Sequence, residues 1–134
     1  MRVRTRFVLL LCLLACAGCG KKSTAQLIED LKSSQERDRL IAVRLLPQRK
    51  GEAAQVVPAL IGALKDEGSD IRLSAAIGLG YFGEQARDAI PALQEALRDR
   101  DGRVREQAGV ALSRIDPTRF KEPPKSRSGK GKKS

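Results

Sequence analysis

The sequence repeats itself every 33 residues, and this period limits the folds that the chain can adopt. The stretch from Val57 to Gly83 is followed by a second version that begins at Ile90. Identical residues stand 33 positions apart in many pairs, among them Pro58 and Pro91, Leu60 and Leu93, Leu64 and Leu97, Asp66 and Asp99, Arg72 and Arg105, Ala75 and Ala108, and Leu79 and Leu112. A weaker copy precedes them and keeps in register Leu27, Leu31, Arg39, Ala42 and Leu46. A period of this length is typical of stacked supersecondary units, so we expect a repeat array.

Each copy has the apolar spacing of two helices joined by a polar turn. In the first half of the strong copy, apolar residues at i, i+3, i+4 and i+7 line one helix face: Val57, Leu60, Ile61 and Leu64. The second half keeps this spacing with small residues such as Ala75 and Gly78, which let a neighbouring helix approach closely. In the turns, Ser69 or Asp101 is expected to cap the second helix. The pattern predicts an all-α fold of about three helical hairpins, over residues 24–50, 51–83 and 84–118.

Three positions recur within both strong copies. A proline opens the first helix, an aspartate follows eight positions later, and an arginine stands fourteen positions after the proline: Pro58, Asp66 and Arg72, then Pro91, Asp99 and Arg105. The arginines lie within Ile-Arg-x-x-Ala-Ala or Val-Arg-x-x-Ala-Gly. This pattern resembles the HEAT repeat, most closely the short HEAT-like form of phycobilisome-lyase-type proteins and many bacterial scaffolds. The resemblance implies a short α-solenoid in which a structural ladder ties successive repeats together through Asp66, Arg72, Asp99 and Arg105.

The first copy departs from this pattern. Ala25 replaces the proline and Ser33 replaces the aspartate. Charged Asp38 and Arg44 stand where the later copies have apolar residues. These changes are typical of a terminal capping repeat, whose outer side has no neighbour and faces water.

The chain begins with the features of an export signal. Arg2, Arg4 and Arg6 precede an apolar run from Phe7 to Ala17. This run has about half of the ~20 residues that a membrane-spanning helix needs, so residues 1–18 are predicted to be a signal peptide. All cysteines lie at its end and none occurs in the repeats, which excludes a disulfide framework: Cys12, Cys16 and Cys19.

The segment from Leu14 to Gly20 resembles a bacterial lipobox, in which small residues precede a cysteine that receives lipid. Two registers compete: Cys19 follows small Ala17 and Gly18, whereas Cys16 has Leu13 in the usual leucine position. We favour Cys19, with residues 19–23 as a short tether; an ordinary cleaved signal is the alternative. The resemblance implies a protein that is exported and attached by lipid to a bacterial cell membrane, inner or outer, facing the periplasm or the cell exterior.

The positive charge of the chain lies mostly outside the repeats. Of the net +10, the three signal arginines contribute +3 and residues 119–134 contribute +6, which leaves +1 for residues 19–118. The segment 119–134 lacks apolar periodicity and is predicted to be a disordered tail. From Lys121 to Lys133 it suits an anionic polymer or an anionic membrane, or serves only as a solvated end. Nucleic acid is disfavoured because no aromatic residues are interleaved with the basic ones.

The composition argues against catalysis. The chain has no histidine, which removes the commonest general base and metal ligand. A G-x-G-x-x-G match at residues 78–83 falls at a helix end instead of between a strand and a helix, so we interpret it as accidental. We predict no enzyme activity, no metal and no cofactor. The family resemblance offers a bilin-lyase-like subunit as a less favoured alternative, since no histidine or repeat cysteine is present to handle a tetrapyrrole.

Binding to a protein or peptide partner is the remaining function. In HEAT arrays the second helices line the concave face, so the resemblance implies the following candidate contact residues: Leu73, Ala76, Tyr81, Glu106, Ser113 and Arg114. We expect a membrane-anchored scaffold or adaptor. The alternative is a polyanion-binding or membrane-binding envelope protein that acts through its basic tail.

Overall fold

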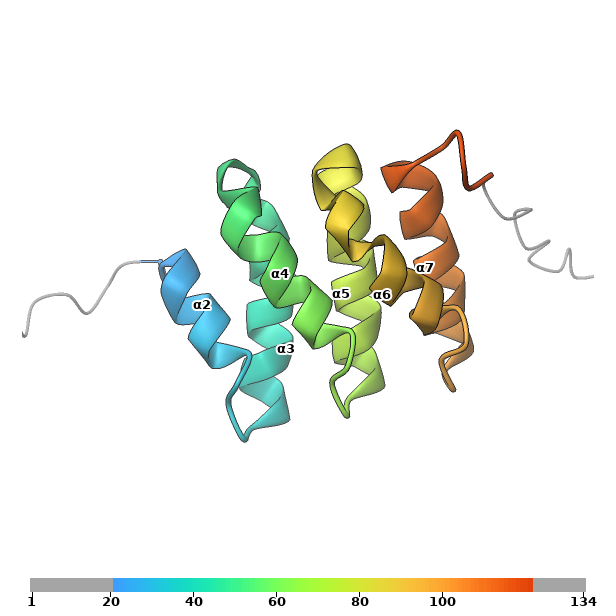
Figure 1. Cartoon of the computed structure of the whole chain (residues 1–134). Helices are drawn as coiled ribbons and strands as arrows, with labels where there is room; N and C mark the ends of the chain where they lie inside the picture. Colours follow the sequence, from blue (N-terminus) through green and yellow to red (C-terminus); the bar gives the residue numbers. More distant parts are fainter. Residues whose placement is uncertain (1–20, 122–134) are drawn as a thin grey trace, which may run out of the picture.

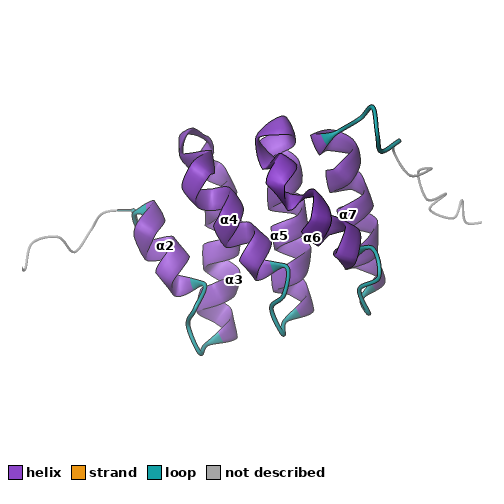
Figure 2. Cartoon of the chain, viewed as in Figure 1, coloured by secondary structure: helices purple, strands orange, loops and turns teal. Residues whose placement is uncertain are grey.

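The computed structural model describes residues 21–121, and this part of the chain is helical with no strand (Figure 2). Within it, six α-helices form three hairpins: α2 (Thr24–Asp30) with α3 (Glu36–Leu45), α4 (Ala53–Ala63) with α5 (Ser69–Phe82), and α6 (Ile90–Ala96) with α7 (Gly102–Ile115). The hairpins stand side by side in chain order, with α3, α5 and α7 in one layer and α2, α4 and α6 in the other (Figure 1). The predicted all-α solenoid of three hairpins is confirmed.

The helix ends follow the capping chemistry of the sequence. At the start of α2, the Gln26 N–H donates to Ser23 Oγ (3.2 Å), and the Ser23 N–H donates to Gln26 Oε1 (2.9 Å), which together form a capping box. Asp101 caps α7 by accepting from the Arg103 N–H (2.8 Å). Ser69 does not cap α5, because the helix already begins at Ser69 and Gly68 is the N-cap residue. Gly83 ends α5 at φ 53°, a conformation that favours glycine.

The two repeat prolines have different surroundings. Pro58 lies inside α4, which begins five residues earlier at Ala53. Pro91 is near the start of α6 and is preceded by a 3-10 segment, Gly83–Ala89, in which Ala86 is not helical. The residues ahead of the proline therefore form α-helix in the second repeat, where the proline does not open the helix, and a 3-10 segment in the third.

The core is continuous from one repeat to the next because small residues separate the helices. The leucines that define the repeat are almost fully buried: Leu60, Leu79, Leu93 and Leu112. Gly78 lies so close to the first repeat that an added Cβ would stand 2.7 Å from Pro47 Cγ. On the other side of α5, the same atom on Gly80 would stand 3.3 Å from Ala111 Cα. The glycines thus set the spacing of α5 from its neighbours.

The first repeat is not a purely polar cap. Asp38 is half-buried and accepts from the Ser33 hydroxyl (3.2 Å). Ile41 and Leu45 on α3 are 43% and 37% exposed, although a capping repeat was expected to turn polar residues outward. Arg44 does not face the outer side as that expectation implied, because it lines a groove between α3 and α5.

The folded part extends beyond the predicted boundary at residue 118. After α7, the Phe120 N–H donates to the Asp116 carbonyl oxygen (2.9 Å), and the Phe120 side chain packs against the core. Arg119 stacks its guanidinium over the Phe120 ring at 5.3 Å. The tail predicted over 119–134 therefore begins too early, and residues from 122 onward lie outside the described part of the chain.

Candidate protein-binding groove

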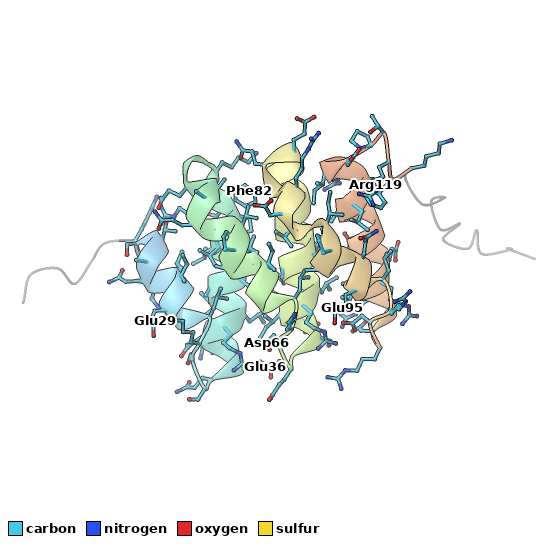
Figure 3. All side chains as sticks on the ribbon, viewed as in Figure 1. Glu29, Glu36, Asp66, Phe82, Glu95 and Arg119 are labelled. Atoms are coloured by element: carbon cyan, nitrogen blue, oxygen red, sulfur yellow. The ribbon has the colours of Figure 1, made fainter. Side chains whose placement is uncertain are left out.

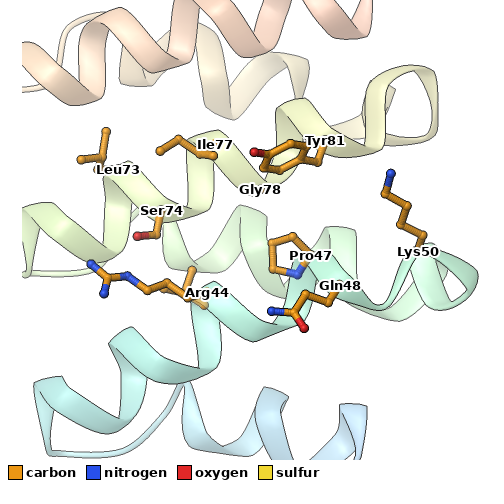
Figure 4. A pocket seen from close by; sticks show the side chains of 10 residues that line it. Arg44, Pro47, Gln48, Lys50, Leu73, Ser74, Ile77, Gly78 and Tyr81 are labelled. Atoms are coloured by element: carbon orange, nitrogen blue, oxygen red, sulfur yellow. The ribbon is translucent and has the colours of Figure 1, made fainter.

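A groove runs between α3 and α5 on the layer formed by the second helix of each hairpin (Figure 4). Its volume is about 590 Å³. Side chains from α3, from the segment that follows it and from α5 line it: Val43, Arg44, Pro47, Gln48, Lys50, Leu73, Ser74, Ile77, Gly78 and Tyr81.

Local sequence effects open this groove. Proline is unfavourable in the interior of an α-helix because it has no N–H to donate, and α3 ends at Leu45, two residues before Pro47. The chain then makes two short 3-10 turns that place Gln48 and Lys50 at the end of the groove near Tyr81 (Figure 4). Gly78 contributes no side chain to the floor, so the groove keeps its depth between Pro47 and α5.

One face of α5 supplies the apolar wall. Leu73, Ile77 and Tyr81 recur every four residues and form a row along the groove (Figure 4). Tyr81 is 58% exposed, which is unusual for the largest side chain of a small helical domain. A rigid, accessible aromatic ring beside aliphatic residues is the kind of anchor on which protein interfaces depend.

The candidate binding residues have different positions. Leu73 and Tyr81 line the groove. Glu106 and Arg114 are exposed on α7, one repeat further along, and are not part of the groove lining. The prediction that Ala76 and Ser113 contact a partner is wrong for this surface: Ala76 is fully buried on α5, which packs against α7, and Ser113 is 7% exposed.

Several lining residues were absent from the sequence-based set: Arg44, Pro47, Gln48, Lys50 and Ile77. Two of them can be located from the repeat period. Arg44 stands 33 residues before Ile77, and Gln48 stands 33 residues before Tyr81. Equivalent positions on adjacent second helices lie side by side, so each groove residue on α5 points to a counterpart near α3.

The aspartate and arginine ladder joins the hairpins at the end where their turns gather, near Asp66 in Figure 3. Arg39 donates from Nε and Nη2 to the two carboxylate oxygens of Asp66 (2.8 and 3.2 Å). Arg72 makes the same two bonds to Asp99 (2.7 and 2.9 Å). The role of these pairs is to hold adjacent repeats in register.

These pairs keep the aspartates ionised. The hydrogen bond from Arg72 lowers the pKa of Asp99 below its usual value, against a smaller effect of burial. For Asp66, burial raises the pKa, but hydrogen bonds from Arg39 and from the Gly68 N–H together outweigh it and leave the pKa lowered. These carboxylates are therefore structural ion-pair partners, which is a different role from that of a catalytic acid.

Arg105 makes only part of the ladder contact. Its Nη1 donates to the carbonyl oxygens of Asp99 and Arg100 (2.7 and 3.2 Å), just as Arg72 Nη1 donates within its own turn. Its Nε and Nη2 have no carboxylate partner within residues 21–121. Arg105 therefore braces its own turn and joins no further repeat in the described part of the chain.

Metal ligands and membrane-spanning helices are two further features that bear on function. In the described range 21–121, no three His, Cys, Asp or Glu side chains are grouped in a way that would hold a metal ion. No helix in that range combines the length and apolar character needed to cross a bilayer. Cys16, Cys19 and the segment 122–134 lie outside the described residues.

Comparison with known proteins agrees with this architecture. A family model described as HEAT repeats matches residues 24–113. A solved structure of the complex of CpcE and CpcF of phycocyanin lyase from Nostoc sp. PCC7120 is similar, with 31% sequence identity and a TM-score of 0.64. The match covers 75% of this chain but 40% of the chain in that complex, and no curated protein matches. Since the family model spans all three hairpins, the chain belongs to the HEAT-repeat family.

Proposed function

We propose that this protein is a non-catalytic HEAT-repeat adaptor, held at a bacterial membrane by lipid on Cys19, that binds a partner protein in the groove between α3 and α5. The observation that carries the proposal is the groove itself, with the exposed ring of Tyr81 beside Leu73 and Ile77. HEAT arrays present such surfaces to protein partners. The similar solved structure is itself a complex of two proteins.

The attachment determines where the adaptor works. Three residues, Gly20 to Lys22, separate Cys19 from the capping residue Ser23. Such a short tether holds the repeats close to the membrane surface, so the partner is expected to be a membrane-bound protein or one that passes near the membrane. Each buried methylene of the attached acyl chains contributes about 0.8 kcal/mol to anchoring.

The test is recovery of crosslinked partners from living cells by an affinity tag, followed by mass spectrometry. We expect one defined protein to be recovered with the wild-type chain and lost with Tyr81→Ala. Arg98→Gln is the control, because Arg98 is exposed just after α6, in the layer opposite the groove. A chain that ends at Lys121 is expected to keep the partner.

The opposite pattern would contradict the adaptor proposal. If the partner survives Tyr81→Ala but disappears when residues 122–134 are removed, the basic tail is the binding element. Recovery that then weakens steeply with salt would identify an anionic polymer or anionic lipid as its ligand.

A second candidate is supported by the solved structure, whose chain belongs to a phycocyanin lyase complex. In this view the protein is one subunit of an enzyme assembly that handles a chromophore. The chain spans only 40% of that protein and has no histidine, so the adaptor remains the better-supported proposal. Visible-light absorption by the purified protein after co-expression with a bilin source would favour the lyase-like function.

A further inference from the structure

The groove between α3 and α5 has cationic side chains along its edge. Arg44 lies beside Ser74, and Lys50 lies at the other end, beyond Tyr81 (Figure 4). Both residues are exposed, and neither pairs with a carboxylate within residues 21–121. No Asp or Glu belongs to the lining. The groove therefore presents positive charge without its own counter-charge.

Two acidic residues that precede the α5 part of the lining are already paired elsewhere, and exposed Glu52, two residues after Lys50, is not part of the lining. Asp70, one turn before Ser74, accepts from Arg103 Nη2 (3.0 Å), and Asp66 is held by Arg39. These pairs lie toward the hairpin turns and link different repeats. Arg44 and Lys50 are thus available to a carboxylate supplied by another molecule.

The apolar residues of the lining limit the classes of ligand that fit the groove. A simple polyanion would leave the row of Leu73, Ile77 and Tyr81 in contact with water and unused. An acyl chain would use that row, but the groove is open enough to leave Tyr81 58% exposed, so one side of the chain would stay wet. A peptide carries its own polar backbone for the open side and suits both features of the groove.

The tail of this chain does not supply such a peptide. From Lys121 to Ser134 it has six basic residues, one acidic residue and no Leu, Ile, Val, Met or aromatic side chain. It has neither the apolar anchors for the α5 row nor the charge that Arg44 and Lys50 would attract.

We propose, on the basis of the adaptor function proposed above, that the groove recognises an acidic, apolar segment of the partner protein. One or two large apolar side chains of that segment pack against Leu73, Ile77 and Tyr81, and flanking Asp or Glu residues pair with Arg44 and Lys50. The charges select the segment and the apolar contacts hold it.

The test is selection of a random 12-residue peptide library displayed on phage against the purified protein, followed by affinity measurement with fluorescein-labelled versions of the enriched peptides. We expect enriched peptides to combine aromatic or aliphatic residues with Asp or Glu. The double variant R44E/K50E should weaken them by about tenfold or more, since two attractive charges become repulsive. R98E changes the same charge type just after α6, in the layer opposite the groove, and should leave affinity within twofold.

Charge reversal gives a second, positive readout. Replacement of the Asp and Glu residues of a peptide by Lys should abolish binding to the wild-type protein and restore it with R44E/K50E. If groove binders that are lost with Tyr81→Ala prove neutral or basic, the acidic specificity is wrong while the groove function stands.

Other outcomes would contradict the groove function as well as the acidic specificity. Enriched peptides that ignore Tyr81→Ala, or no enrichment at all, would contradict both the specificity and the groove function. Vesicles of phosphatidylglycerol that bind the wild-type protein but not R44E/K50E, with no acidic peptide enriched, would assign the groove to anionic lipid instead.

Discussion

Arg72 and Arg105 occupy the same position in two successive repeats but have different partners. The side chain of Arg72 is 6% exposed, and it holds both carboxylate oxygens of Asp99, whose side chain is 11% exposed. Arg105 contacts only the backbone of its own turn within the described residues. The same change at the two positions should therefore have unequal effects.

Arg72→Gln should lower the free energy of unfolding by about 3 kcal/mol, because it leaves the shielded Asp99 carboxylate without its charged partner. Arg105→Gln should cost less than about 1 kcal/mol, since no ion pair is lost. Urea unfolding followed by circular dichroism measures both values. Equal losses would show that the ladder pair contributes no more than the bracing of each turn.

The lowered pKa values of Asp66 and Asp99 predict how stability depends on pH. A carboxyl group whose pKa is lower in the folded state contributes stability that is present above its unfolded pKa, about 4, and is lost as pH falls through the folded pKa. Asp101, held by hydrogen bonds from Arg103 to a pKa of about 2, acts in the same direction.

We therefore expect the urea midpoint to fall as the solution is taken below about pH 4. Asp99→Asn should be less stable at neutral pH and should lose less on acidification, because one of the responsible groups is gone. Unfolding curves at pH values between 3 and 7 provide the comparison. Parallel losses in the wild type and the variant would mean that Asp99 is not among the groups that titrate with unfolding.

The glycines of α4 and α5 offer a matched pair at the level of helix packing. An added methyl group on Gly78 would stand 2.7 Å from Pro47 Cγ and 3.1 Å from Leu60 Cδ1. The same group on Gly62, in α4, would meet nothing within 4 Å. Gly78→Ala should cost about 1 to 3 kcal/mol by overpacking, whereas Gly62→Ala should stabilise by up to about 1 kcal/mol through helix propensity.

Thermal melts of the two alanine variants distinguish packing from propensity. If Gly78→Ala raised the melting temperature as Gly62→Ala does, the close approach of α5 to the first repeat would be incorrect, and with it the width of the groove that Gly78 helps to form.

Hairpins and their caps were predictable because their information is local. Apolar spacing, Ser23 with Gln26, and Gly83 each act within a few residues. The binding face was predicted less well. The second helix of each hairpin is covered on two sides, by the first helix of its own hairpin and by the next repeat. Periodicity alone does not say which residues outside the apolar stripe are covered by the next repeat. Ala76 was therefore placed on the surface although α5 buries it.

Arg44 was misassigned for a related reason. A charged residue in a terminal repeat suggests an outer, solvent-facing side, but a concave groove edge accepts a charge equally well because it is also in water. Only the position of α3 beside α5 distinguishes the two surfaces. The partner class that we propose therefore rests on this arrangement and not on the sequence pattern.

The extent of the folded molecule gives a further prediction. Phe120 packs on the core after α7, and the sequence that follows Lys121 has no Leu, Ile, Val or aromatic residue to add to it. A chain that ends at Lys121 should melt within about 1 °C of the full chain, whereas Phe120→Ala should lower the melting temperature by several degrees as buried apolar contact is lost. A large loss on removal of residues 122–134 would show that they contact the repeats.

Site-specific photo-crosslinking in living cells tests most directly whether the groove is the working surface. A photoreactive phenylalanine analogue placed at position 77 would lie in the groove, and one at position 94 would lie on α6 in the opposite layer. We expect one discrete protein adduct from position 77, reduced by Tyr81→Ala, and none from position 94. No adduct from position 77, or the same adduct from both positions, would contradict the proposal that this protein is a groove-binding adaptor.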